Sequence, residues 1–287
     1  MPLSGRLLSV KAVIINADDF GSHVKANKAI LHAHTEGILT SASLMVNGDA
    51  VEEAVQIAEE HPTLAVGLHL TVVNGRASLP SSMVPRIVNE FGMFEEDPFK
   101  AGLRYYFSSR ARWEVQQEVE AQFRQFASLG IDWSHVDGHH HMHMHPVVWD
   151  AIIANCEEYG IQRIRIPNEE WRPVTQERLR NRKLEWTFFQ FLRKRCLKSL
   201  KNKGFVYADN VYGHVESGHM NEAYVLGLLD RLAGKTNEIY FHPGTPHADK
   251  MPGMKGMDVE LHALLSREIK EKLEDLEIKR CSYIDLE

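Results

Sequence analysis

The stretch His135-Val136-Asp137-Gly138-His139-His140-His141-Met142-His143-Met144-His145-Pro146 carries the strongest signal for the fold and chemistry of this chain. It holds six of the 16 histidines. If the stretch is extended, every second side chain falls on one face, and that face carries Asp137 and five histidines. Neutral imidazole is the commonest side-chain ligand of metals, so the stretch predicts a metal site. The alternative is a solvated histidine-rich loop that binds nothing in particular.

Not all of these side chains can bind one ion. A catalytic metal site usually takes three protein ligands and keeps one position open for water or substrate. We therefore expect one or two ligands from this stretch, and we expect other histidines in it to handle protons or substrate. A strand expected at residues 131–136 delivers the stretch at its end.

The composition is that of an ordinary globular protein, with 44% hydrophobic and 25% charged residues among 287. We interpret residues 1–287 as a single domain. The net charge of −6 argues against a general nucleic-acid binder. Cys156, Cys196 and Cys281 have no CxxC spacing, which indicates reduced, buried or inert thiols and a cytoplasmic compartment. The N-terminal segment is typical of neither a signal peptide nor a membrane span.

Polar residues recur where apolar strands end. The β-branched run 13–15 is typical of a buried parallel strand, and it is followed by Asp18 and Asp19, which are costly to bury unless they are paired or bind a metal. Another expected strand, 64–70, ends around His69, and His242 directly follows a third. The alternatives are a turn with a helix cap for the two aspartates, and a satisfied core histidine for His69.

Strands and helices alternate through most of the chain. Residues 74–110 interrupt this pattern as an irregular insertion over the strand ends, which we expect to form part of a substrate cleft. Further strands are expected at 38–46, 163–167, 206–213, 238–241 and 281–284, and helices at 24–36, 49–60, 111–129, 146–159, 223–233 and 259–276.

This alternation implies parallel strands joined by crossover helices. In an α/β barrel the working groups lie at the carboxyl ends of the strands, so Asp18, Asp19, His69, His139 and His242 would converge on one mouth. We therefore predict an α/β fold, a TIM-like (β/α) barrel with fewer or irregular strands. A doubly wound open sheet is the alternative.

Two basic features have open interpretations. Arg165 is predicted either to face an anionic or hydroxylated substrate or to form a surface salt bridge. Residues 178–203 form a basic aromatic segment with ten Lys or Arg and one acid, Glu185. Such a segment is typical of an ordinary surface helix, and also of a helix that lies on an anionic membrane surface.

At these residues the chain resembles the YdjC-like, or ChbG-like, carbohydrate deacetylases. The resemblance runs from about Val13 to the C-terminus and implies a TIM-like barrel, a divalent metal, and removal of acetyl groups from N-acetylated amino sugars. The family's metal ligands fall on Asp19, His69 and His139. The matching motifs are Asn16-Ala17-Asp18-Asp19-Phe20-Gly21, Thr40-Ser41-Ala42-Ser43-Leu44-Met45-Val46-Asn47, Gly67-Leu68-His69, His135-Val136-Asp137-Gly138-His139-His140-His141 and His242-Pro243-Gly244.

Within that family, the segment from Ala101 to Phe123 resembles the HpnK branch, which is associated with hopanoid biosynthesis. This implies an N-acetylglucosaminyl hopanoid as the substrate. A lipid-linked sugar would also explain the basic aromatic segment as a peripheral contact with the inner face of the membrane. Gly138 departs from the serine that is usual in the chitooligosaccharide enzymes, and Met142 and Met144 depart from the usual loop. These departures bear on the substrate rather than on the metal.

The resulting hypothesis is a hydrolysis in which one divalent ion, Mg²⁺ or Zn²⁺, polarises the acetamide carbonyl and lowers the pKa of a water. Asp18 is the expected general base, and His242 or His141 protonates the departing amine. Arg165, His143 and Asp137 are expected to bind the substrate.

Two imidazoles favour zinc or a similar ion, although the family is often described with magnesium. The expected partner is a carbohydrate or glycolipid, and a homodimer is the expected assembly. The rival functions are another metal hydrolase on the same barrel, such as a phosphoesterase, and a non-catalytic store of metal ions.

Overall fold

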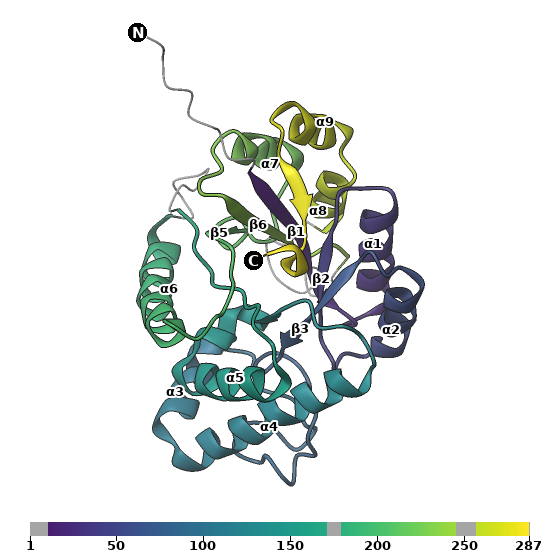
Figure 1. The fold of residues 1–287 in the computed structure, drawn as a ribbon. Coiled ribbons are helices and arrows are strands. Elements are labelled where there is room, and N and C mark those ends of the chain that lie inside the picture. The colour runs from purple at the N-terminus through teal and green to yellow at the C-terminus, as the bar shows by residue number, and fades with distance from the viewer. Residues whose placement is uncertain (1–10, 171–178, 245–256, 287) are drawn as a thin grey trace.

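The computed structural model describes residues 11–170, 179–244 and 257–286 (Figure 1). Strands and helices alternate as predicted. The strands are β1 (Ala12–Phe20), β2 (Ser41–Leu44), β3 (Ala65–Leu70), β4 (Val136–Gly138), β5 (Asn210–Tyr212), β6 (Thr236–Phe241) and β7 (Lys279–Cys281). The α-helices are α1 (Val24–Thr35), α2 (Val51–Glu60), α3 (Pro98–Phe107), α4 (Ser109–Ser128), α5 (Pro146–Tyr159), α6 (Leu179–Leu200), α7 (Glu222–Leu229), α8 (Met257–Leu264) and α9 (Arg267–Asp275). The 3₁₀ helices η1 (His139–Met144) and η3 (Tyr283–Asp285) follow β4 and β7.

The strands form one parallel sheet with β1 at its centre. The order across the sheet is β4-β3-β2-β1-β6-β5, and β7 also pairs with β1. β7 pairs with Ala12 to Ile14, whereas β2 pairs with β1 from Asn16 to Phe20. Because β6 runs along β1 from Ala12 to Ala17, β7 and β2 must share the other edge of β1, one after the other.

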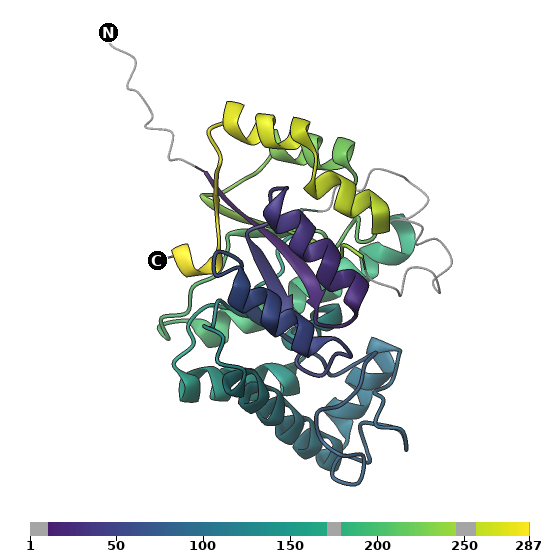
Figure 2. The same ribbon diagram turned by 90° about the vertical axis from the view of Figure 1, so that its right-hand side faces the viewer.

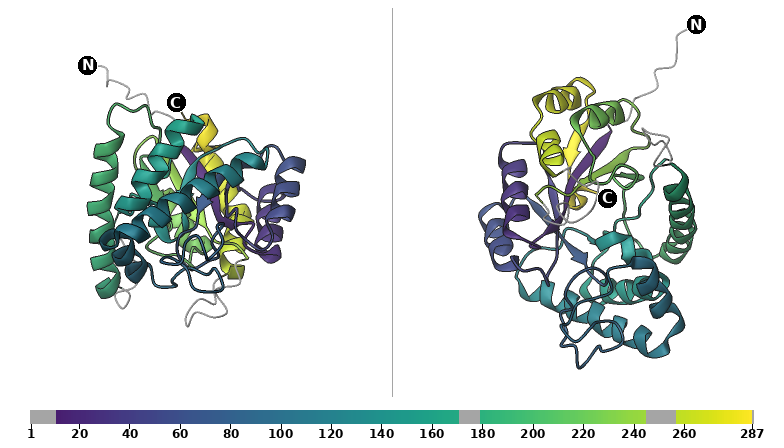
Figure 3. Two further views of the ribbon diagram at one scale, coloured as in Figure 1. Left: turned by 90° about the horizontal axis from the view of Figure 1, so that it is seen from below. Right: turned by 180° about the vertical axis from the view of Figure 1, so that it is seen from behind.

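The sheet curls into a half-barrel and does not close (Figure 1, Figure 3). The strand expected at 163–167 is not formed, because this segment makes only single bridges and Pro167 lacks the N–H that a ladder requires. The segment still lies between β4 at one edge of the sheet and β5 at the other, but it is joined to them by isolated bridges and not by a ladder. The bridges are Val136–Ile164, Arg163–Val206 and Asn168–Val211. The α/β class with a parallel sheet is thus confirmed, and the closed form of a TIM barrel is not observed.

The two faces of the sheet differ in polarity. Val13, Ile15 and Ala17 of β1 belong to the main apolar core, which lies between the sheet and the helices, with α1 and α2 in front of the sheet in Figure 2. Asn16 and Asp18 alternate with these residues and point to the opposite face, where they are hydrogen-bonded to each other. The concave face of the half-barrel is therefore polar and carries the candidate site.

The insertion at 74–110 is irregular only in its first part. Its second part contains α3, which the sequence analysis missed. Asp97 caps this helix by accepting hydrogen bonds from the N–H groups of Phe99 and Lys100, and Pro98 occupies the first turn. The Asp-Pro pair before an apolar run was the signal available in the sequence.

α4 confirms the predicted amphipathic helix. Val115, Val119, Phe123 and Phe126 are fully buried in the core. On its other buried face, Glu118 accepts hydrogen bonds from two backbone N–H groups of the insertion, at 2.7 and 3.0 Å. The same helix therefore packs on the sheet side and holds the irregular segment in place.

In the C-terminal third, the strand expected at 206–213 is shortened to β5, and the strand expected at 281–284 is replaced by β7, which ends at Cys281, and by η3. The helix predicted at 259–276 is divided into α8 and α9, because Ser266 caps α9 by accepting a hydrogen bond from the Ile269 N–H. The basic aromatic segment forms α6 from Leu179 onward, and Arg178 lies outside the described residues. None of the helices in the described part of the chain has the length and apolarity that a membrane span requires. All three cysteines are buried free thiols, as predicted.

Candidate metal centre

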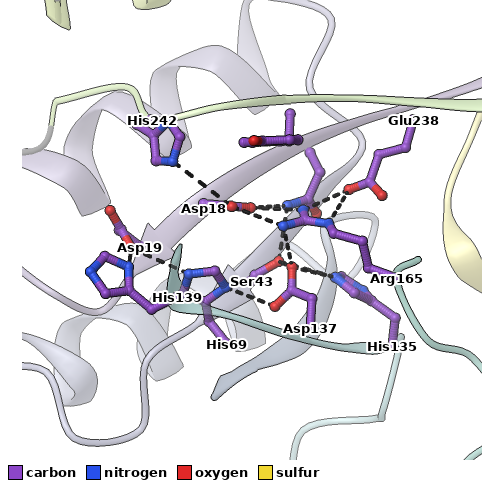
Figure 4. A network of polar contacts seen from close by, with 12 residues as sticks. Asp18, Asp19, Ser43, His69, His135, Asp137, His139, Arg165, Glu238 and His242 are labelled. Carbon is purple, nitrogen blue, oxygen red and sulfur yellow. Dashed lines mark hydrogen bonds and ion pairs between the residues drawn. The ribbon is translucent and has the colours of Figure 1, made fainter. Parts of the chain in front are cut away.

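Asp18 and Asp19 are neighbours in the chain, yet both belong to the site (Figure 4). In a regular strand adjacent side chains point to opposite faces. The pairing of β1 with β2 shifts register between Ala17 and Phe20, and Asp19 has a φ of 64°, which few residues other than glycine adopt. This β-bulge allows two consecutive acids to serve one site. Backbone outliers of this kind concentrate at functional sites.

The histidine stretch is not extended beyond Gly138. Residues 139–144 form η1, in which His140 and His141 have φ angles of 52° and 54°. A strand requires negative φ at each residue, so the expectation that alternate histidines share one face is wrong. In this turn the side chains of alternate histidines contact different partners: His139 contacts Asp19, His141 contacts Tyr240, and His143 contacts the carbonyl of Arg165.

Asp19, His69 and His139 come together from β1, β3 and η1 (Figure 4). Asp19 Oδ1 lies 3.0 Å from His139 Nδ1 and 3.4 Å from His69 Nε2. All three residues are buried, and a potential ligand atom from each lies within 4.8 Å of the others. Neither contact of Asp19 Oδ1 has the geometry of a hydrogen bond, so within the described residues this atom accepts none, as expected for an atom aimed at a shared ion. Two imidazoles and one carboxylate fit a divalent transition ion.

Asp137 orients His69 behind this group. The Nδ1–H of His69 donates to Asp137 Oδ1 at 2.7 Å, which leaves Nε2 facing Asp19 and is the arrangement usual behind ligating histidines. Burial lowers the pKa of His69, but the charges of Asp137 and Asp18 outweigh burial and raise this pKa to about 10. Burial raises the pKa of Asp19, yet the imidazoles of His139 and His69 hold it well below the usual carboxyl range. A divalent ion would take the place of the proton on His69.

A second group with metal-ligand spacing is Asp18, His69 and Asp137. Its two carboxylates are already bound by Arg165, whose Nη1 lies 2.9 Å from Asp18 Oδ2 and 2.7 Å from Asp137 Oδ2. An ion placed there would compete with a guanidinium, so the group containing Asp19 suits a cation better. The two groups share His69 and therefore offer room for one ion at a time.

Arg165 binds three carboxylates in the interior of the half-barrel. Besides Asp18 and Asp137, it donates to Glu238 Oε1 from Nε at 3.0 Å and from Nη2 at 2.6 Å. Burial lowers the pKa of Arg165, but the carboxylates outweigh burial and raise this pKa well above its usual value. The side chain is 0% exposed. The surface salt bridge considered from the sequence is therefore wrong. The expected contact of Arg165 with a substrate would need an exposed atom, and this side chain has none.

Ser43 joins the two halves of the buried network. Its hydroxyl donates to Asp137 Oδ2 at 2.8 Å and accepts from Asn16 Nδ2 at 2.9 Å and from His135 Nε2 at 3.0 Å. Asn16 Nδ2 also donates to Asp18 Oδ1 at 2.9 Å. These hydrogen bonds connect Asp137, which orients His69, to Asp18, which precedes Asp19 in the chain. The position of each of these two carboxylates therefore depends on the other.

His242 lies at the rim, directly after β6. Its Nε2 is 3.9 Å from Asp18 Oδ2, and its Nδ1 is 3.8 Å from Glu260 Oε2. Its side chain is 25% exposed, against 10% for His139 and 1% for His69. Among these groups His242 is the one that reaches both the network and solvent.

A comparison with protein families matches residues 12–275 to the family described as YdjC-like protein. The chain belongs to the YdjC-like family. A carbohydrate deacetylase from Brevibacillus brevis is 31% identical over 277 residues, which cover 96% of this chain and 99% of that protein. A chitooligosaccharide deacetylase from Serratia marcescens is 31% identical over 161 residues, which cover 56% of this chain and 61% of that protein.

Solved structures also resemble this YdjC-like chain. A protein from Enterococcus faecalis V583, described as a candidate cellobiose-phosphate cleavage protein, has a TM-score of 0.75 at 26% identity and covers 96% of this chain and 98% of its own. An uncharacterised protein from Agrobacterium tumefaciens C58 has a TM-score of 0.51 at 10% identity, covering 97% and 89% of the two chains. The second likeness is one of fold alone.

The remaining residues proposed from the sequence lie below the rim of this YdjC-like site. His141 is hydrogen-bonded to the Tyr240 hydroxyl at 3.0 Å, and His143 Nε2 donates to the backbone carbonyl of Arg165 at 3.2 Å. Burial lowers the pKa of His143 to about 4, so this imidazole is neutral near pH 7. His143 and Asp137 are 0% exposed. Like Arg165, they form hydrogen bonds with other site residues, and their contact with a substrate stays a prediction.

Sequence reasoning assigned no role to Ser43, His135 or Glu238 in this YdjC-like chain. Each lies at a position that alternates with core residues of its own segment, and each is 0% exposed. The available signal was a polar residue next to apolar residues within an expected strand, such as Ser43 between Ala42 and Leu44. Read with the period of two, such residues mark the polar inner face.

Proposed function

We propose that this YdjC-like protein is a metal-dependent hydrolase that removes the N-acetyl group from an N-acetylated amino sugar and releases acetate. One observation carries the proposal: Asp19, His69 and His139 converge with the spacing of metal ligands directly beside Asp18, which Arg165 holds in place. Amide hydrolysis needs a polarised carbonyl and a base for the attacking water. The names of the relatives from Brevibacillus brevis and Serratia marcescens support a carbohydrate amide as substrate.

Asp19, His69 and His139 are the residues that would hold the ion. An ion held by these residues would supply Lewis-acid chemistry, which polarises an amide carbonyl and lowers the pKa of a water. Two imidazole ligands favour zinc or a similar transition ion over magnesium, which prefers oxygen ligands. Metal analysis of the purified protein distinguishes the two.

Asp18 takes the proton from the attacking water. Both of its oxygens accept hydrogen bonds from Arg165, and Oδ1 also accepts one from Asn16, so its carboxylate is fixed before substrate binds. This preorganisation lowers the cost of reaching the transition state.

His242 gives a proton to the departing amine. It lies 3.9 Å from Asp18 and is partly exposed at the rim, where a sugar can approach. His141 suits this role less well, because its Nε2 is engaged by the Tyr240 hydroxyl and because burial holds its pKa well below the usual imidazole range.

The decisive experiment incubates the metal-reconstituted protein with N-acetylated chitobiose and with an N-acetylglucosaminyl-lipid analogue, and measures free acetate. We expect acetate from at least one of them, and Asp18→Asn should abolish its release while keeping the bound metal. Wild-type protein that carries metal and releases no acetate from any N-acetylated amino sugar would refute the proposal.

The lipid-linked substrate, an N-acetylglucosaminyl hopanoid, is the finer form of this proposal. It rests on the resemblance to the HpnK branch, and it implies a peripheral membrane contact through α6. Phe188 and Phe191 of this helix are 55% and 67% exposed, and aromatic side chains beside Lys and Arg suit an anionic membrane surface. Binding to anionic vesicles that weakens with salt supports it, whereas no binding at low salt leaves α6 an ordinary surface helix.

Two rival functions have distinct outcomes in the same preparation. A phosphoesterase, or a phosphosugar-cleaving enzyme as the name of the Enterococcus faecalis protein suggests for that protein, would release phosphate or a free sugar instead of acetate. Arg165 is already bound by three carboxylates and is not available to a phosphate. A metal store would bind several ions per chain, while the two candidate groups among the described residues share His69.

A further inference from the structure

Tyr283 lies at the bottom of the half-barrel, in the last 3₁₀ turn of the described chain. Its hydroxyl donates to Glu238 Oε2 at 2.5 Å, and its side chain is 0% exposed. Its ring stacks on His135, with ring centres 4.4 Å apart and planes 18° from parallel. The ring also packs with Ile14 and Cys281, apart from the main core. A residue near the C-terminus therefore contacts two members of the buried polar network.

Glu238 connects Tyr283 to the rest of that network. Its Oε2 accepts the Tyr283 hydroxyl, and its Oε1 accepts two hydrogen bonds from Arg165. Arg165 in turn binds both oxygens of Asp18. A continuous chain of charge-assisted hydrogen bonds thus runs from the C-terminal segment to the carboxylate that lies beside the candidate metal group.

We propose that Tyr283 is a positioning residue: its hydroxyl fixes Glu238, which fixes Arg165, which holds Asp18 in the orientation that catalysis requires. This inference rests on the role of Asp18 in the proposed function. It goes further by making a C-terminal residue, remote from the rim, a determinant of the rate.

The competition for Arg165 explains why one hydroxyl matters. One guanidinium faces the carboxylates of Asp18, Asp137 and Glu238, so its position depends on how strongly each carboxylate is held by its other partners. Without the Tyr283 hydroxyl, Glu238 Oε2 would be a buried acceptor that has lost its donor, which makes the present position of this carboxylate less favourable. Glu238 and Arg165 would then shift together, and Asp18 with them.

The protonation state of Tyr283 agrees with this role. Burial and the charge of Glu238 raise the pKa of Tyr283 well above its usual value. The phenol therefore keeps its proton and remains a donor throughout the working range of an enzyme. The alternative is that Tyr283 only fills the bottom of the half-barrel with its ring.

Tyr283→Phe separates the two roles, because it keeps the ring and removes the hydroxyl. We expect kcat for acetate release to fall about ten- to a hundredfold, as for other indirect partners of an active site, with KM unchanged because the loss affects only the transition state. Tyr105→Phe is the matched control. Tyr105 is also 0% exposed, so it lines no open surface of the insertion, and it donates to the carbonyl of Val72 at 2.6 Å, outside the network. The kcat of this variant should therefore stay at the wild-type value.

A double-mutant cycle tests the route. In a Glu238→Gln background, Tyr283→Phe should add little to the loss of kcat, since residues that act through one another are not additive. A full additional loss in that background would contradict transmission through Glu238. An unchanged kcat in the Tyr283→Phe variant would overturn the proposal.

A readout that does not need activity separates this inference from the proposed function. The Nε–H of Arg165 is buried and bonded to Glu238, so its exchange with solvent in NMR spectra should be slow in wild type and in Tyr105→Phe. It should become clearly faster in Tyr283→Phe. Unchanged protection refutes the positioning role. Faster exchange in a protein that releases no acetate from any substrate upholds the coupling of Tyr283 to Arg165 and refutes the deacetylase instead.

Discussion

Arg165 holds both carboxylate oxygens of Asp18, with Nη1 2.9 Å from Oδ2 and Nη2 2.8 Å from Oδ1. Two parallel hydrogen bonds of this kind fix direction as well as distance. Since the same guanidinium binds Asp137 and Glu238, it links the residue that orients His69 to the expected base. The geometry of the metal group and the geometry of the base are therefore set by one side chain.

Arg165→Met should destabilise the protein strongly. It leaves buried carboxylates without their cation, and breaking a buried ion pair in this way costs about 3–5 kcal/mol. Urea denaturation measures the change. Arg195→Met is the control, because the pair of Arg195 with Asp150 is partly exposed and should contribute at most about 1 kcal/mol. Similar losses in the two variants would mean that the buried network is not held by Arg165.

His69→Ala should remove both the bound ion and acetate release. The variant deletes the one residue that both candidate metal groups share, so no group with three ligands remains among the described residues. Metal content per chain after dialysis, measured by elemental analysis, should fall from one to none. His32→Ala, at an exposed position of α1, should keep the ion. Metal retained in the His69 variant would argue against this centre.

Gly67→Ala should disturb the site from β3. A Cβ at this position would lie 2.4 Å from His135 Nδ1 and 2.6 Å from the His135 carbonyl oxygen, so the His135 ring that donates to Ser43 must move. Overpacking of this kind costs about 1–3 kcal/mol, and kcat should fall with it. In contrast, Gly227→Ala in α7 meets nothing within 4 Å and should stabilise by about 0.5–1 kcal/mol. The same sign in both variants would contradict the close approach seen at Gly67.

Glu169 should make stability depend on pH. Burial raises its pKa from 4.5 to about 7, although the N–H groups of Gly213, His214 and Val215 oppose this shift. Between these two values the folded state keeps a proton that the unfolded state has lost. Stability is therefore greatest below about pH 4.5 for this group and declines by roughly 3 kcal/mol as pH rises to about 7.

The Glu169→Gln variant isolates this effect, because glutamine does not titrate. The difference in unfolding free energy between wild type and variant should change across that pH window. A constant difference would indicate that the three backbone N–H groups keep Glu169 ionised in the folded protein.

Much of the fold could be predicted because it depends on local pattern. The helix of α4 follows from apolar residues at helical spacing, and the end of α5 follows from Gly160, which adopts the left-handed conformation. The segment 163–167 was misjudged because alternation alone predicts a strand, whereas a ladder also needs a partner with matching N–H and C=O groups. α3 was missed because its exposed aromatic residues mask the helical period.

The sequence by itself determined the α/β alternation and the residues that stand at the strand ends, because strand and helix periods and caps are properties of neighbouring residues. It also singled out Asp19, His69 and His139 through family resemblance. Only the tertiary structure showed how the adjacent Asp18 and Asp19 can both serve one site, because the bulge at Asp19 is a backbone conformation that the neighbouring residues do not specify. Only the tertiary structure placed Arg165 against Asp18, 147 positions away. Contacts across the inside of a curled sheet depend on the order of the strands, and the neighbours of either residue in the chain do not reveal that order.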